Sequence, residues 1–140
     1  MGVLRMGYVH ARVTDLEEAR NHYSNTLGME VVQSEPGKLY LKCWDEWDHH
    51  SLVLEEGGVG LVKLGYKVED ADALHDFEQR AQKFGVTTGR FSAGENLTVG
   101  QGVSLTLPSE HTIDLYAEME FTGTETGLNV AADRLALYVW

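Results

Sequence analysis

Histidine is the residue in this sequence best suited to metal binding or proton transfer near neutral pH. His10 stands in the stretch GYVHARV, among apolar residues of an expected strand. A facial metal site built on it would need two histidines and one carboxylate on the same side. The neighbouring sequence does not complete such a set, so we expect His10 to be a cavity or interface histidine rather than a ligand.

A second pair of histidines lies in the acidic stretch WDEWDHHS. Neighbouring residues of a strand point to opposite faces, so His49 and His50 would not chelate one ion together unless they sit in a loop. Because Asp45, Glu46 and Asp48 precede them, an acidic loop that picks up a metal ion stays open as an alternative. The composition favours a solvated hairpin tip.

Other residues with reactive side chains have simpler interpretations. Cys43 has no basic neighbour of the kind that activates a thiol, so we expect a buried or interface cysteine. Glu110 and His111 follow a Pro-Ser pair, which predicts a surface turn. We expect none of these three side chains to carry chemistry.

The composition limits the classes of partner. Among 140 residues, 22 are acidic and 11 are basic, which gives a formal net charge of −11. Such a surface repels phosphate backbones, which argues against nucleic acid. No apolar run approaches the ~20 residues of a membrane span, and no secretory signal is visible. With a single cysteine there is no internal disulfide, and the expected location is cytoplasmic.

The elements that would carry these residues form a recognisable order. Apolar and polar residues alternate over 9–13, which predicts a strand. Thr14 and Glu17 then read as a capping box that starts a helix, and Gly28 ends it. Three short strands are expected to follow, at 29–33, 38–44 and 51–55.

The same order then returns. Asp15 and Asp70 are 55 positions apart. Asp70 opens a second helix that Gly85 ends, after an alternating stretch at 62–68 and before strands expected at 86–91, 101–107 and 112–117. Repetition at this length predicts two like modules. We therefore predict an α+β fold with the helices on one face of a mixed sheet. Its single domain, 1–121, would consist of two tandem βαβββ modules, 1–57 and 61–121, followed by a linker-like tail at 122–140.

Alternation also assigns the two faces of that sheet. The helices need an apolar face, which we expect to hold Val9, Ala11, Val13, Val62, Leu64, Val68, Ile113, Leu115 and Ala117. The opposite face would line a polar concavity with Tyr8, His10, Arg12, Lys63, Lys67, Asp114, Tyr116 and Glu118. A concavity of that kind is where a ligand site is expected.

Paired βαβββ modules are the plan of the vicinal oxygen chelate superfamily, which includes glyoxalases and bleomycin resistance proteins. Four stretches go further and resemble the N-terminal domain of catechol 2,3-dioxygenases, the type I extradiol enzymes also called metapyrocatechases. They are GYVHARVTDLEEARNHYSNTLGMEVV, KLYLKCWDEWDHHSLVLEE, LGYKVEDADAL and PSEHTIDLYAEMEFTGTETGLN. The resemblance covers residues 1–129, and DLYAEMEFTG is its most family-specific part.

In that family the chain continues into a second domain, which holds Fe(II) with two histidines and one glutamate. The matching positions here are Tyr8 for the first histidine, Lys63 for the second and Asp114 for the glutamate. Lysine offers no lone pair at neutral pH, and a phenol with an ordinary pKa of ~10 is a poor ligand. The resemblance therefore implies that this half binds neither a metal nor another cofactor, like the N-terminal domain of the family.

We therefore expect the non-catalytic N-terminal domain of a catechol 2,3-dioxygenase-like protein, inactive alone. Its partners would be a catalytic C-terminal domain and further copies of the chain in a homo-oligomer. The alternative is a free-standing dimeric member of the superfamily that binds a small molecule or uses a metal. Its cavity would be lined by Tyr8, His10, Lys63, Asp114 and Tyr116. Residues 130–140 have no family counterpart, and we expect their apolar end to pack on a second copy or across the sheet.

Overall fold

Strands and helices follow one another along the chain in the order that the repeated pattern predicts. The computed structural model describes residues 2–121. The first half contains β1 (Val3–Val13), α1 (Leu16–Arg20), the π-helical segment η1 (Asn21–Thr26), β2 (Glu30–Glu35), β3 (Lys38–Lys42) and β4 (Leu52–Glu56). The second half contains β5 (Gly60–Val68), α2 (Ala71–Lys83), β6 (Thr87–Phe91), β7 (Gly102–Thr106) and β8 (Thr112–Tyr116). β1 begins well before the alternating stretch that predicted it.

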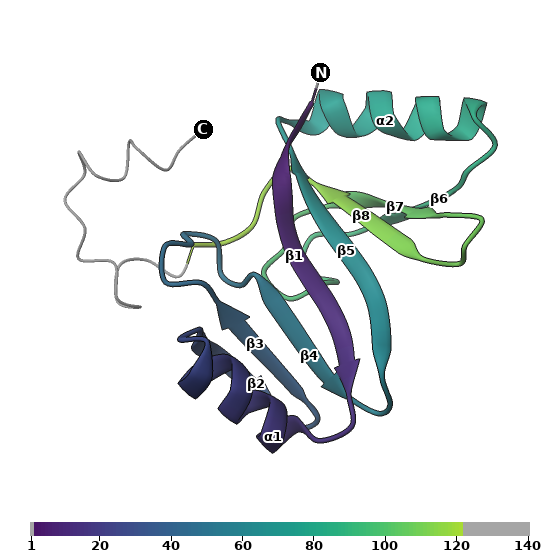
Figure 1. Ribbon diagram of the computed structural model, residues 1–140. Helices are drawn as coiled ribbons and strands as arrows, with labels where there is room; N and C mark the ends of the chain where they lie inside the picture. Colours follow the sequence, from purple (N-terminus) through teal and green to yellow (C-terminus); the bar gives the residue numbers. More distant parts are fainter. Residues whose placement is uncertain (1, 122–140) are drawn as a thin grey trace.

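The strands form one mixed sheet in the order β2-β3-β4-β1-β5-β8-β7-β6. β1 runs parallel to β4 and β5 runs parallel to β8, while the other neighbouring strands are antiparallel. The central antiparallel pair of β1 and β5 joins the two halves (Figure 1). The predicted α+β fold of two tandem βαβββ modules is confirmed.

Both helices begin at an aspartate. The carboxylates of Asp15 and Asp70 each accept a hydrogen bond from the backbone N–H three residues further on, at 2.9 and 2.8 Å. The prediction that Thr14 caps the first helix is wrong by one position, because Asp15 has the extended backbone that aims its carboxylate at the first turn. Gly28 and Gly85, at φ values of 77° and 85°, follow the two helical segments as predicted.

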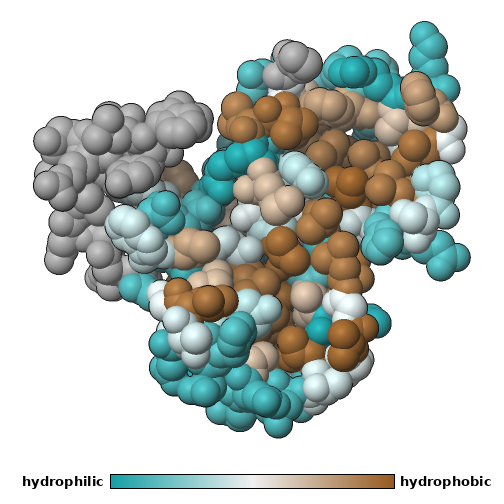
Figure 2. Space-filling view, viewed as in Figure 1, coloured by the Kyte–Doolittle hydropathy of each residue, from teal (hydrophilic) through white to brown (hydrophobic). Residues whose placement is uncertain are grey.

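Both helices lie on the apolar face of the sheet. Around α1 the core contains Ala11, Val13, Leu16, Ala19, Leu39, Leu41 and Leu54, and around α2 it contains Val68, Leu74, Phe77, Val103, Ile113 and Leu115. The helices cover opposite ends of the sheet, and Figure 2 shows apolar side chains gathered between them. On β1 and β5 the exposed large hydrophobic residues are Val3, Leu4, Met6 and Leu61.

Aromatic and apolar side chains fill most of the opposite face. Those buried there are Tyr8, Tyr40, Val53, Phe91, Val99, Tyr116 and Met119. Val99 comes from the loop between β6 and β7, and His50 from the loop between β3 and β4 packs against the same rings. Because both loops fold back over this face, the expected polar concavity is reduced to a small cavity.

Two further expectations concern the surface and the end of the chain. Within residues 2–121, no helix combines the length and the apolar character needed to cross a bilayer. The tail predicted at 122–140, together with the packing expected for its apolar end, lies outside the described residues.

Candidate functional site

Tyr8, Lys63 and Asp114 come from three adjacent strands and meet on the face that the loops cover. The ammonium of Lys63 lies 2.9 Å from Oδ2 of Asp114. The hydroxyl of Tyr8 donates to the same oxygen at 3.2 Å. The structure therefore brings together the three positions at which the family resemblance places iron ligands.

Tyr8 reaches Asp114 across an intervening strand because Gly65 has no side chain. The strand register aligns Tyr8 with Gly65, and Gly65 with Asp114. Two strand spacings, about 9.6 Å, thus separate the backbones of Tyr8 and Asp114. A Cβ at Gly65 would lie 2.3 Å from Cε1 of Tyr8, so the ring of Tyr8 occupies the space above that glycine.

The carboxylate of Asp114 is fully enclosed, since the residue is 1% exposed. Ser104 Oγ donates to Oδ1 at 2.5 Å, and Asn96 Nδ2 lies 3.4 Å from Oδ2. Lys63 also donates to Asn96 Oδ1 at 2.6 Å. Sequence reasoning missed both neutral partners. Ser104 could have been found as the polar residue between two apolar ones on its strand, whereas Asn96 lies in a loop without a periodic signal.

The chemistry of this cluster does not suit iron. Lysine carries its protons on the nitrogen that a metal would need. Burial, and then the negative charge of Asp114, raise the pKa of Tyr8, so its hydroxyl remains a protonated donor. Within residues 2–121, no group of three or more His, Cys, Asp or Glu side chains could hold a metal ion. The residues present therefore do not fit Fe(II); they neutralise and fix a buried carboxylate.

A cavity of about 70 Å³ adjoins the cluster, and Tyr8, His10 and Lys63 belong to its lining. The remaining lining residues are Lys38, Tyr40, His50, Val53, Glu95, Asn96 and Leu97. Asp114 and Tyr116, the other two residues expected at a cavity, lie outside this lining. At ~30 Å³ per molecule the space suits roughly two waters, whereas small-molecule pockets measure about 300–1,000 Å³.

Tyr116 is packed into the interior of the same face. Its side chain is fully buried, and its ring centroid lies 5.6 Å from that of Tyr8. A Cβ at Gly7 would lie 1.7 Å from the hydroxyl oxygen of Tyr116, so β1 needs a glycine there. Burial raises the pKa of Tyr116. Among the described residues its hydroxyl has no hydrogen-bond partner.

His10 pairs with an acid on the neighbouring strand. Its Nε2 lies 3.0 Å from Oε2 of Glu55, and the residue is 8% exposed. Burial lowers the pKa of His10, although the hydrogen bond and charge of Glu55 act in the opposite direction. Burial thus favours the neutral imidazole, which lines the cavity beside Tyr8.

The histidine pair of the loop between β3 and β4 is not at a solvated tip, and that prediction is wrong. His50 is 1% exposed, and its ring packs edge-on against Tyr8 and Tyr40 with centroid separations of 5.4 and 5.1 Å. Burial, and then the charge of His49, lower the pKa of His50 to about 3. The local sequence gave no sign of this packing because Tyr8 and Tyr40 belong to other strands.

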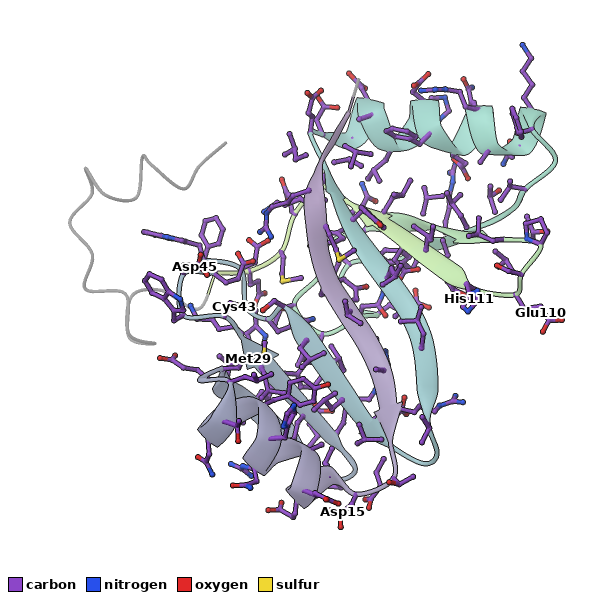
Figure 3. All side chains as sticks on the ribbon, viewed as in Figure 1. Asp15, Met29, Cys43, Asp45, Glu110 and His111 are labelled. Atoms are coloured by element: carbon purple, nitrogen blue, oxygen red, sulfur yellow. The ribbon has the colours of Figure 1, made fainter. Side chains whose placement is uncertain are left out.

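The acids of the same loop bind cations of the sheet. Arg5 contacts Oε2 of Glu46 at 2.8 Å and Oδ2 of Asp48 at 2.8 Å. Lys67 contacts both oxygens of Asp48 at 3.0 Å. Glu46 and Asp48 therefore tie the loop to β1 and β5, which weakens the alternative of an acidic metal-binding loop. Asp45 lies at the exposed end of the loop (Figure 3).

Two further expectations concern surface residues. Cys43 is exposed, so the prediction of burial is wrong in this chain, and an interface role stays a prediction. Glu110 and His111 lie at the exposed turn between β7 and β8, as predicted (Figure 3). Glu110 has the positive φ of 67° that such a turn requires.

Two larger hollows lie elsewhere on the molecule. One of about 400 Å³ runs beside α2, where Glu78 and Arg90 form an ion pair at 2.6 Å. Another of about 600 Å³ lies beside Met119 and Phe121. The lining of neither includes a member of the cluster around Asp114.

Known proteins with similar sequences include a metapyrocatechase and a dioxygenase. Residues 63–120 match a family described as the catechol 2,3-dioxygenase-like N-terminal domain. Over 124 residues the chain is 40% identical to a metapyrocatechase of Pseudomonas sp. (strain CF600), a match that covers 87% of this chain and 40% of that protein. Over 119 residues it is 20% identical to a manganese-dependent 2,3-dihydroxybiphenyl 1,2-dioxygenase of Geobacillus genomosp. 3, covering 84% of this chain and 38% of that protein.

Solved structures agree with the sequence matches. The 2,3-dioxygenase LapB from Pseudomonas sp. KL28 superposes with a TM-score of 0.83 at 39% identity, covering 94% of this chain and 47% of that chain. A homoprotocatechuate 2,3-dioxygenase variant from Brevibacterium fuscum gives a TM-score of 0.82 at 27% identity, covering 90% of this chain and 35% of that chain. The chain thus spans less than half the length of each of these relatives. By sequence and by fold, the chain is similar to the N-terminal domains of catechol 2,3-dioxygenase-like proteins, and its fold fits the vicinal oxygen chelate superfamily.

Proposed function

We propose that this domain is non-catalytic and forms part of an extradiol dioxygenase. A following domain would bind Fe(II) and use O₂ to cleave a catechol ring beside the diol. The observation that carries the proposal is the ion pair of Lys63 and Asp114, because it stands where a catalytic module would need a metal ligand and its carboxylate partner. The cavity of about 70 Å³ beside it gives little support to the alternative of a free-standing small-molecule binder.

In such an enzyme this domain would provide surface that binds the catalytic domain or further copies of the chain. Val3, Leu4, Met6 and Leu61 remain exposed on the two central strands, between the helices. Exposed apolar side chains favour association, here with the catalytic domain or with further copies of the chain in a homo-oligomer. The single cysteine, Cys43, fits a reducing cytoplasmic location.

The proposal is tested by supplying the purified chain with Fe(II), catechol and air-saturated buffer, and recording the coloured ring-cleavage product. We expect no turnover and no stoichiometric iron in the 140-residue chain. The positive control is a metapyrocatechase of full length under the same conditions. Product formation that rises in proportion to bound iron would show that the domain is catalytic and would refute the proposal.

A further inference from the structure

Lys63 holds its positive charge against two side-chain oxygen atoms, one of which belongs to a buried carboxylate. The ammonium lies 2.6 Å from Asn96 Oδ1 and 2.9 Å from Asp114 Oδ2. Tyr8 and Ser104 donate hydrogen bonds to the same carboxylate. The Lys63 side chain is 19% exposed, and that of Asp114 is 1% exposed. The arrangement is therefore a cation held by oxygen atoms at the edge of a small cavity.

The buried carboxylate needs that charge. Neutral donors such as Tyr8 and Ser104 supply hydrogen bonds, but an ionised carboxylate out of contact with water also needs a counter-ion. Among the described residues, Lys63 is the cationic side chain within salt-bridge distance of Asp114. The cations Arg5 and Lys67 are bound to Asp48 instead. The charge of Lys63 is thus not duplicated nearby.

We propose that the Lys63 ammonium occupies an internal cation site and neutralises the Asp114 carboxylate there, as a bound cation would. Asp114 and Asn96 form the site, and Tyr8 and Ser104 hold the carboxylate in place. The carboxylate oxygen of Asp114 and the amide oxygen of Asn96 are acceptors that any ammonium group of suitable size can use. When the side chain is shortened, the vacated site will accept a small alkylammonium ion. The assignment does not depend on the reaction of any parent enzyme.

The test compares unfolding midpoints in urea for Lys63→Met, which keeps most of the side-chain volume, and for Lys38→Met. Lys38 lines the same cavity and is the matched control. We expect Lys63→Met to lower the unfolding midpoint clearly more than Lys38→Met does. The double variant Lys63→Met/Asp114→Asn should recover much of the lost midpoint, because it no longer buries an unpaired carboxylate. Equal losses for the two lysine variants would overturn the proposal.

Rescue separates the role of charge from that of packing. For Lys63→Ala we expect ethylammonium to raise the unfolding midpoint with single-site saturation. Tetramethylammonium at equal ionic strength, which is too large for the site, should leave the midpoint unchanged, and so should each cation with the unaltered chain. A Lys63→Ala variant whose midpoint does not respond to ethylammonium would overturn the proposal. If the single variants do not fold, restoration of folding by Asp114→Asn supports it, and failure of that double variant to fold refutes it.

Discussion

Gly65 controls the contact between β1 and β8, although it has no side chain of its own. The ring of Tyr8 fills the volume above it and carries the phenol hydroxyl to Asp114. On β1, Gly7 likewise leaves room for the side chain of Tyr116, whose hydroxyl lies against it. Each of the two central strands therefore uses a glycine to make room for an aromatic ring.

Gly65→Ala should lower the free energy of unfolding by about 1–3 kcal/mol, the usual cost of an overpacked interior. Its Cβ would come within 2.3 Å of the Tyr8 ring and displace it. Gly89→Ala on β6 is the control, since its Cβ would meet no atom within 4 Å. Urea unfolding of both variants checks the prediction, and equal stability would contradict it.

His50 should make stability depend on pH. Burial, and then the charges of His49, His10 and Lys63, lower the pKa of His50 from 6.5 to about 3. At pH values between about 3 and 6.5, His50 is protonated in the unfolded chain and neutral in the folded chain. Stability is therefore full above pH 6.5 and falls as the pH drops towards about 3, by up to about 1.4 kcal/mol per pH unit.

The slope, measured from urea unfolding between pH 7 and pH 4, should be reduced in His50→Gln. The exposed His111→Gln at the turn between β7 and β8 is the control. An unchanged slope in His50→Gln would mean that other groups account for the acid sensitivity of the fold.

At the scale of single elements, the two helices start in the same way. Asp15 and Asp70 occupy matching places in the repeat, and each carboxylate caps the first turn. The elements that cover the cavity follow no such repeat. Arg5 and Lys67 hold the loop between β3 and β4 through ion pairs with Asp48. The loop between β6 and β7 contributes Asn96, which accepts a hydrogen bond from Lys63.

Asp15→Ala should cost about 1 kcal/mol of stability, the typical value of an N-cap, while Thr14→Ala should cost clearly less. The reason is that the capping bond to the first turn of α1 comes from Asp15. Thermal or urea unfolding of the two variants distinguishes them. A larger loss for Thr14→Ala would restore the capping box that the sequence suggests.

At the scale of the whole molecule, the chain is two copies of one plan joined along β1 and β5. Tyr8 lies in the first half, and the ion pair of Lys63 and Asp114 lies within the second, so the hydrogen bond from Tyr8 to Asp114 spans the joint. At this scale we also expect the chain supplied with Fe(II) not to cleave catechol. The pairing of the halves, which brings three family positions together, here produces a structural contact.

Much of this architecture could be predicted because it depends on local pattern. The period of two in β1 and β5 identified the strands and their faces, and glycines marked the ends of both helices. The placement of His50 could not be predicted in this way. An acidic, polar stretch normally indicates a solvated loop, and here its burial depends on rings from β1 and β3.

The sequence by itself determined the repeated order of strands and helices, the family, and the identity of the residues at the three family positions. Only the tertiary structure decided that Tyr8 and Lys63 meet on one oxygen of Asp114 and that two loops leave a cavity of about 70 Å³. The physical reason is that periodicity records which face a residue prefers. Contacts between distant residues depend instead on strand order, on register and on the space that Gly65 and Gly7 leave free.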